Sequence, residues 1–117
     1  MDQFELYDIV EHAIDFAFKG KFVLNMYEYL KSIKATKRDV QEFIDSSTSK
    51  EINFIILDLD DYLEGGNDDA HKQLREGYGH LGKPEARKIR NYLYGILQSA
   101  WKYEQEKRPG RKRKLSK

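Results

Sequence analysis

The sequence predicts an all-α protein, a compact bundle of five or six helices with a long C-terminal helix and a disordered basic tail. Apolar residues recur at steps of three and four along most of the chain, which is the period of a helix buried on one face. Helix-start and helix-stop residues divide these stretches into short segments. At 117 residues the chain can bury one modest core but not two. We therefore expect a single helical domain over residues 1–106 and a tail over residues 107–117.

Local signals in the first part of the chain predict three helices. The first ends before Gly20, because glycine is a common helix stop. The second covers about residues 22–33. Thr36 and Asp39 stand at the spacing of a capping box, in which each side chain pairs with the backbone of the other. A short third helix is expected to follow them.

A fourth helix is expected where Thr48 and Glu51 repeat the capping-box spacing, and it should stop at Gly65 and Gly66. Its stretch INFIILDLDD, residues 52–61, also fits a buried strand, because the apolar run is short and contains β-branched residues. A lone strand would have no partner. We therefore expect a helix here.

Two further helices complete the bundle. Asn67 is the expected N-cap of a short fifth helix. Pro84 is expected at the first position of a long last helix over about residues 84–106, since proline needs no N–H donor there. One stripe of this helix should face the core, and its members are Ala86, Ile89, Leu93, Ile96, Leu97, Ala100 and Tyr103.

The composition excludes several kinds of site and partner. The chain has no cysteine, which excludes disulfides, zinc sites built on thiolates and cysteine nucleophiles. No apolar run approaches the roughly 18 residues needed to span a bilayer, so no membrane partner is expected. The expected location is the cytoplasm, or the nucleus if the source is eukaryotic.

The charge is unevenly distributed along the chain. Residues 1–70 contain 7 Lys and Arg against 16 Asp and Glu, a net charge of −9, whereas residues 71–117 contain 14 against 4, a net charge of +10. This asymmetry indicates an end of the molecule that binds a polyanion. The alternative is that the two halves attract each other across the fold.

The stretch GYGHLGK, residues 77–83, is rich in glycine. Its spacing is that of a dinucleotide-binding turn, but that turn requires a preceding strand, which the sequence lacks. GHLGK resembles the GXXG loop of KH domains, which clamps an RNA backbone, although the KH sheet has no counterpart. HLGKPEARKI resembles the second half of a helix-hairpin-helix element, which implies phosphate contacts by backbone amides, with His80 where the family has its first glycine. The alternative is an ordinary helix end, with Gly77 and Gly79 chosen for positive φ.

Basic and aromatic residues alternate on a second stripe of the last helix. Cations there could pair with phosphates and aromatic rings could stack on bases, although Tyr94 and Trp101 could instead complete the core, as we expect for Trp101. The tail adds seven Lys and Arg in 11 residues, a density suited to a polyanion. The candidate nucleic-acid-binding residues are Lys83, Arg87, Arg90, Tyr94, Lys107, Arg108, Arg111, Lys112, Arg113 and Lys114.

An acidic stretch offers a second candidate surface, for a basic protein partner, at Asp58, Asp60, Asp61 and Glu64. These carboxylates could also hold a weakly bound metal ion. The three histidines are scattered, and no nucleophile, base and orienting group are found together. No catalytic residue, cofactor or metal site is therefore expected.

These observations predict a small nucleic-acid-binding accessory or regulatory protein that contacts phosphates through its basic C-terminal helix and tail. DNA and RNA are both open as ligands. A protein-protein adaptor or inhibitor that uses the acidic helix is the alternative function, and a metal-dependent enzyme is the third.

Overall fold

The described part of the chain is entirely helical. A computed structural model describes all residues except 1–2, 22–24 and 107–117. Within the described residues there are six helices and no strand. The all-α expectation is confirmed, and the helix over residues 52–61 with it, whereas the expected disordered tail lies outside the described residues. The helices are α1 (Gln3–Phe18), α2 (Met26–Ser32), α3 (Lys37–Ile44), α4 (Ser47–Glu64), α5 (Asp69–Tyr78) and α6 (Lys83–Glu106).

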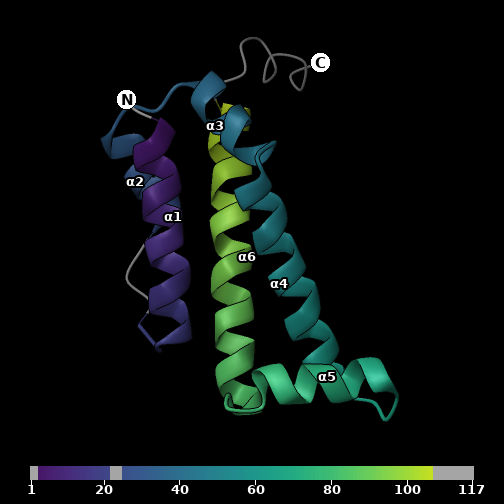
Figure 1. Ribbon diagram of the computed structural model, residues 1–117. Coiled ribbons are helices and arrows are strands. Elements are labelled where there is room, and N and C mark those ends of the chain that lie inside the picture. Colours follow the sequence, from purple (N-terminus) through teal and green to yellow (C-terminus); the bar gives the residue numbers. More distant parts are fainter. Residues whose placement is uncertain (1–2, 22–24, 107–117) are drawn as a thin grey trace, which may run out of the picture.

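Helix α6 is the axis of the molecule (Figure 1). Helices α1, α2, α3 and α4 all pack against it, while α5 crosses the end of α4. All seven residues of the expected core stripe are buried, none with more than 3% of its surface exposed. Burial of a Leu or Ile side chain contributes about 1.5–3 kcal/mol, so this single stripe supplies a large share of the folding energy.

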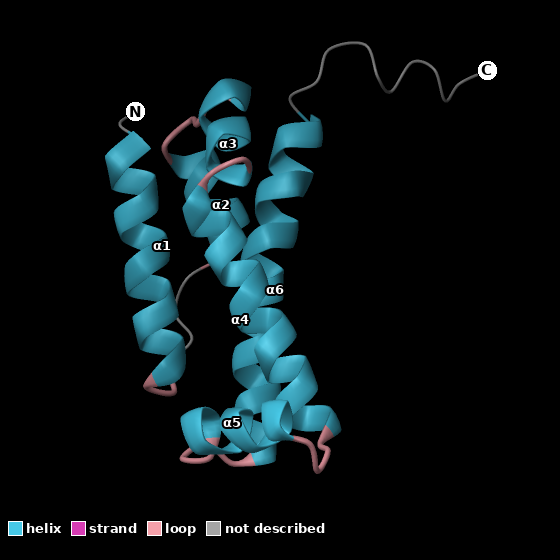
Figure 2. Cartoon of the chain, turned by 45° about the vertical axis from the view of Figure 1, so that its right-hand side comes forward, coloured by secondary structure: helices cyan, strands magenta, loops and turns pink. Residues whose placement is uncertain are grey.

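The two ends of the bundle differ. Helices α2 and α3 and the C-terminal end of α6 lie together at one end, and α5 lies at the other (Figures 1 and 2). The hydroxyl of Tyr103, near the end of α6, donates to the carbonyl of Ala35 in the α2–α3 turn at 2.9 Å. The turn is therefore fixed to α6 by a buried hydrogen bond.

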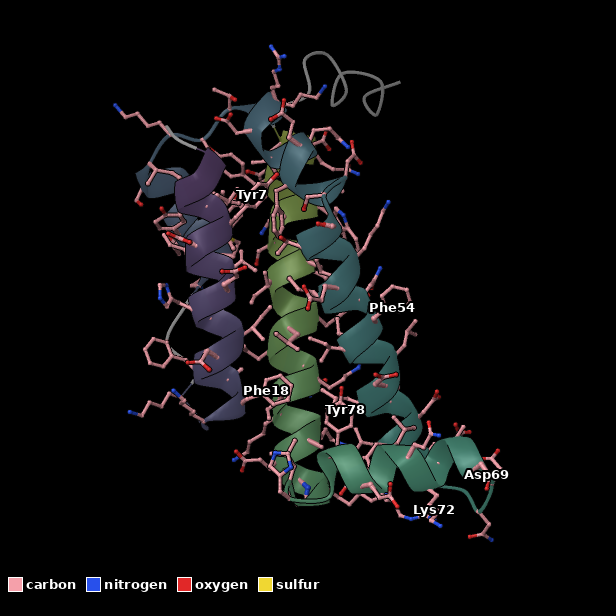
Figure 3. The ribbon with its side chains drawn as sticks, in the orientation of Figure 1. Tyr7, Phe18, Phe54, Asp69, Lys72 and Tyr78 are labelled. Carbon is pink, nitrogen blue, oxygen red and sulfur yellow. The ribbon has the colours of Figure 1, made fainter. Side chains whose placement is uncertain are left out.

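Aromatic contacts hold α5 on the bundle (Figure 3). The ring of Tyr78 stacks on Phe18 of α1 with centroids 6.5 Å apart, and it lies 6.3 Å from the ring of Tyr62 in α4. Burial, and next the nearby carboxylate of Asp58, raise the pKa of Tyr78 above its usual value. Tyr62 in turn donates its hydroxyl proton to the carbonyl of Leu81 at 2.9 Å, which fixes the turn before α6.

The first two helices end in the same way. After α1, the amide of Lys21 donates to the carbonyl of Phe16, and Gly20 has a φ of 82°. After α2, the amide of Ala35 donates to the carbonyl of Leu30, and the intervening Lys34 has a φ of 56°. Both are Schellman motifs, whose left-handed residue is usually glycine because a side chain is strained there. Lys34 is the only non-glycine residue with positive φ in the described chain.

Two expected N-caps were wrong, and one was right. The capping box of Thr36 and Asp39 is present. Helix α4, however, is capped by Ser46 and not by Thr48, which lies inside the helix. Several neighbouring Ser and Thr side chains could cap this helix, and the one closest to the preceding helix does so.

Helix α5 is capped by Asp68 instead of Asn67. Hydrogen bonds from the backbone and then the side chain of His71 lower the pKa of Asp68 below its usual value, because they favour the carboxylate form. Helix α6 begins at Lys83, so Pro84 is its second residue. Pro84 still lies in the first turn, where its missing N–H costs no hydrogen bond.

Replacing a core leucine of α6 should destabilise the protein far more than replacing an exposed leucine. Leu93 is fully buried, while Leu57 on α4 is 57% exposed. We expect Leu93→Ala to lower the free energy of unfolding by about 2–5 kcal/mol and Leu57→Ala by about 0.5 kcal/mol or less. Urea denaturation followed by circular dichroism measures both changes, and equal losses in the two variants would contradict the assigned core.

Candidate nucleic-acid interface

Lys83, the first candidate cation, is exposed, but its ammonium group is bound to the end of α4. Its Nζ donates to the carbonyl oxygens of Tyr62 at 2.9 Å and Leu63 at 3.3 Å, and it lies 5.0 Å from the centre of the Tyr62 ring. These carbonyls belong to the last turn of α4, where the helix dipole is negative. Lys83 thus stabilises the C-terminal end of α4.

A cavity of about 280 Å³ lies beside Lys83, at the junction of α4, α5 and α6. Two more basic side chains line it, and both have partners. The guanidinium of Arg75 donates to the carbonyl of Gly66, and Nδ1 of His71 lies 2.6 Å from Oδ1 of Asp68. His71 and Arg75 therefore contact Asp68 and Gly66, which belong to the segment that connects α4 and α5.

The glycine-rich stretch, residues 77–83, contains the end of α5, the turn after it and the first residue of α6. Gly77 lies in the last turn of α5, and Gly79 caps that helix with a φ of −63°. Any residue can adopt that angle, so the expected positive φ is wrong. Pro84 lacks an N–H, and Glu85 already places a carboxylate in the first turn of α6. This helix start is therefore poorly suited to an anion.

Arg90 joins α6 to the acidic helix α4. Its Nε donates to Oδ1 of Asp60 at 2.8 Å, and its Nη2 lies 3.4 Å from Oδ2 of the same carboxylate. The guanidinium carbon is also 4.9 Å from the centre of the Tyr94 ring. At this position the two oppositely charged halves of the chain do attract each other.

The rest of the second stripe is open to solvent. Arg87 and Lys88 are exposed and form no ion pair within the described residues. Tyr94 and Trp101 are each 37% exposed, so the expectation that Trp101 belongs to the core is wrong. Trp101 lies on the flank of α6, beyond the edge of the buried stripe. The candidates in the tail, from Lys107 to Lys114, lie outside the described residues.

Sequence reasoning missed a second group of cations. The segment KSIKATKR, residues 31–38, holds four basic residues and no acidic one. The net charge of residues 1–70 does not reveal this segment, because acidic residues outnumber basic ones in that part of the chain. We refer to its cations together with one lysine near the end of α6 as the basic end: Lys31, Lys34, Lys37, Arg38 and Lys102.

An aromatic ring holds two of these cations together. The Nζ atoms of Lys31 in α2 and Lys102 in α6 lie 5.1 and 4.6 Å from the centre of the Tyr27 ring. The Tyr27 and Tyr103 rings form an edge-to-face pair with their centroids 6.1 Å apart. Tyr27 is thereby fixed against the core, and it positions lysines from two helices.

Carboxylates partly offset the charge of the basic end. Lys37 lies 3.9 Å from the buried Glu104, and Arg38 pairs with Glu42 at 3.4 Å. Glu106 accepts a 2.6 Å hydrogen bond from the hydroxyl of Tyr27, which raises the pKa of that hydroxyl. Lys31, Lys34 and Lys102 form no ion pair within the described part of the chain.

The basic end is also where the tail begins. Helix α6 ends at Glu106, and Lys107 follows it directly in the chain. The tail is therefore attached to the end of α6 that carries Lys102.

Other kinds of site receive no support from the described residues. No three His, Asp or Glu side chains converge there as ligands for a metal ion. Within the same residues, no helix combines the length and the apolar character needed to cross a membrane.

Comparisons with protein-family models, curated proteins and solved structures found no match to this chain.

The Arg90–Asp60 pair should make a measurable but small contribution to stability. Both side chains are partly exposed, and such pairs contribute about 0.2–1 kcal/mol. A double-mutant cycle with Arg90→Ala and Asp60→Ala, followed by urea denaturation, measures the coupling energy. A coupling of zero would mean that Arg90 is free to bind an external phosphate at no structural cost.

Proposed function

We propose that the protein binds nucleic acid without sequence specificity, as an accessory or regulatory protein, through phosphate contacts at the basic end and the adjoining tail. The observation that carries this proposal is the pair of lysines on Tyr27. Lys31 and Lys102 come from helices distant in sequence and meet on one ring, beside the point where a segment with seven Lys and Arg begins.

The chemistry of this surface suits a phosphate backbone. Lysine ammonium groups neutralise phosphates and release condensed counterions, which favours binding independently of base sequence. The Tyr27 ring restricts two of the lysines, so less side-chain freedom is lost when a phosphate binds. The nearby tail could contact the polymer further along, since 11 residues span at most about 40 Å when extended.

The backbone at Lys34 adds a second argument. A non-glycine residue in a left-handed conformation costs about 1–2 kcal/mol, and Lys34 adopts this conformation in the middle of the basic end. Glycine would relieve that cost but would remove the charge. Strain kept at one residue of a charged cluster is consistent with a role in binding.

The second stripe of α6, which includes Arg87, is expected to contribute less to phosphate binding. Arg87 lies 15 residues before Lys102, or about 22 Å along the helix. Arg90, three residues further along the same helix, is already paired with Asp60 of α4, and that carboxylate repels a phosphate backbone. Arg87 and Lys88 are therefore a matched control for the lysines of the basic end.

Neutralising the basic end should weaken binding and lower its salt dependence. The probe is a labelled DNA duplex of about 20 base pairs, titrated by fluorescence anisotropy from about 50 to 200 mM salt. Each lost phosphate contact should reduce the slope of log affinity against log salt by about 0.9. Replacing Lys31, Lys34 and Lys102 by Gln should therefore reduce the slope by about 2–3.

Two further proteins complete this experiment. Arg87→Gln with Lys88→Gln should change the slope by less than about 1. A full-length chain with the seven basic tail residues replaced by Gln should lose most of its affinity. If the wild-type chain binds neither this duplex nor a single-stranded RNA at about 50 mM salt, the proposal is wrong.

Lys34→Gly should change stability and binding in opposite directions. The free energy of unfolding should rise by about 0.5–1 kcal/mol, because glycine tolerates positive φ, while affinity for the duplex falls. Lys31→Gly is the control, since it lies inside α2 and should lose both stability and affinity. If Lys34→Gly raised stability and left binding unchanged, Lys34 would have no part in the interface.

A further inference from the structure

The outer face of α4 carries two large apolar side chains that nothing in the described structure covers. Phe54 is 68% exposed and Leu57 is 57% exposed, and a spacing of three places them on one face of the helix. Figure 3 shows Phe54 pointing away from α6 and into solvent. Single exposed apolar residues are common on protein surfaces, but neighbouring large ones indicate a binding surface.

Acidic groups surround these two side chains. Asp58 and Asp61 lie on the same outward face, one turn from Phe54 and Leu57 respectively, and both are exposed. Glu51 and Glu64 stand nearer the two ends of the helix and are exposed as well, with Lys50 the one cation among these neighbours. Four carboxylates against one lysine give this face a net charge of −3.

The charge decides what this surface fits. Two copies of the chain meeting on this face would bring two net charges of −3 together, and juxtaposed like charges cost several kcal/mol at an interface. A nucleic acid would be repelled for the same reason. A basic partner with its own apolar side chains satisfies both the carboxylates and the exposed rings.

We propose that the outer face of α4 docks a basic amphipathic helical segment of another protein, whose apolar side chains cover Phe54 and Leu57 while its Lys and Arg residues meet Asp58 and Asp61. The helical form of the partner follows from the shape of the surface. An exposed helix face with anchors at a spacing of three presents a ridge that matches positions i, i+3 and i+4 of a second helix. This surface is separate from the basic end, so it goes beyond the nucleic-acid proposal.

The test uses a synthetic probe of the stated chemistry. It is a labelled helical peptide built from Leu and Lys, with leucines on one face, titrated against the full-length protein by fluorescence anisotropy. Two control peptides accompany it. In one, Ser replaces every Leu and the charge is kept; in the other, Glu replaces every Lys and the apolar face is kept.

Variants locate the binding site on the protein. Phe54→Ser with Leu57→Ser should weaken binding of the Leu and Lys peptide at least tenfold, and Asp58→Asn with Asp61→Asn should weaken it about threefold to tenfold. All four side chains are exposed, and Asn at position 58 keeps an oxygen that can accept the 3.4 Å hydrogen bond from Tyr78, so both variants should stay close to the wild-type midpoint of unfolding. Phe16→Ser with Asp15→Asn, which removes a partly exposed ring and a carboxylate from α1, is the matched control and should change affinity less than twofold.

Several results would overturn the proposal. Equal binding by the Ser peptide would show attraction by charge alone, and equal binding by the Glu peptide would show apolar contact without charge selection. Undiminished binding by the Phe54→Ser, Leu57→Ser variant would place the site elsewhere. If sedimentation showed a dimer that this variant abolishes, the occupant would be a second copy of the chain.

One more comparison tests whether the tail of this chain, and not another protein, covers the outer face of α4. If residues 107–117 covered the face, the full-length chain with a neutralised tail would bind the Leu and Lys peptide much more tightly than wild type. Equal affinity of the two chains supports a separate partner. Neutralising the tail should nevertheless weaken DNA binding, so this docking surface and the proposed function can fail independently.

Discussion

Burial of the apolar stripe of α6 is the constraint on which the rest of the structure depends. Four helices pack on this one helix, and contacts among those four are fewer. Because they share a single stripe, they cover only one side of α6, and the flank that carries Trp101 is left in solvent. The same packing brings α2 and α3 to the last turns of α6. The basic end is thus a consequence of core packing.

The cations of the protein do not all have the same role in the fold. Lys83 and Arg90 contact α4, where they offset the negative end of the helix dipole and the carboxylate of Asp60. These contacts account for part of the attraction between the two halves. Within the described residues, Lys31, Lys34 and Lys102 have no ion-pair partner, whereas Lys37 lies near Glu104. Lys31, Lys34 and Lys102 therefore form a group of cations near the end of α6 that precedes the tail.

The sequence predicted what depends on local spacing and failed where distant segments meet. The buried stripe of α6 and the capping box at Thr36 were read correctly, because helical periodicity and cap spacing are properties of neighbouring residues. The α4 cap was misplaced because Ser46 and Thr48 offer nearly the same chemistry two residues apart. The pairing of Lys31 with Lys102 on one ring could not be predicted. It requires knowing that the α2–α3 turn is bonded to Tyr103, which is 68 residues away from Ala35.

The positions of the two proposed surfaces determine how strongly they influence each other. Asp60 of α4 is paired with Arg90, and Lys102 lies 12 residues further along α6, or about 18 Å. That separation is about twice the Debye length of about 8 Å at physiological ionic strength, but it is shorter than the roughly 30 Å found at 0.01 M. In physiological salt the repulsion between Asp60 and a polyanion at the basic end would therefore be largely screened. At low salt this repulsion would extend to the basic end, so a bound polyanion would be disfavoured on the α4 side of the molecule, where Phe54 and Leu57 are exposed.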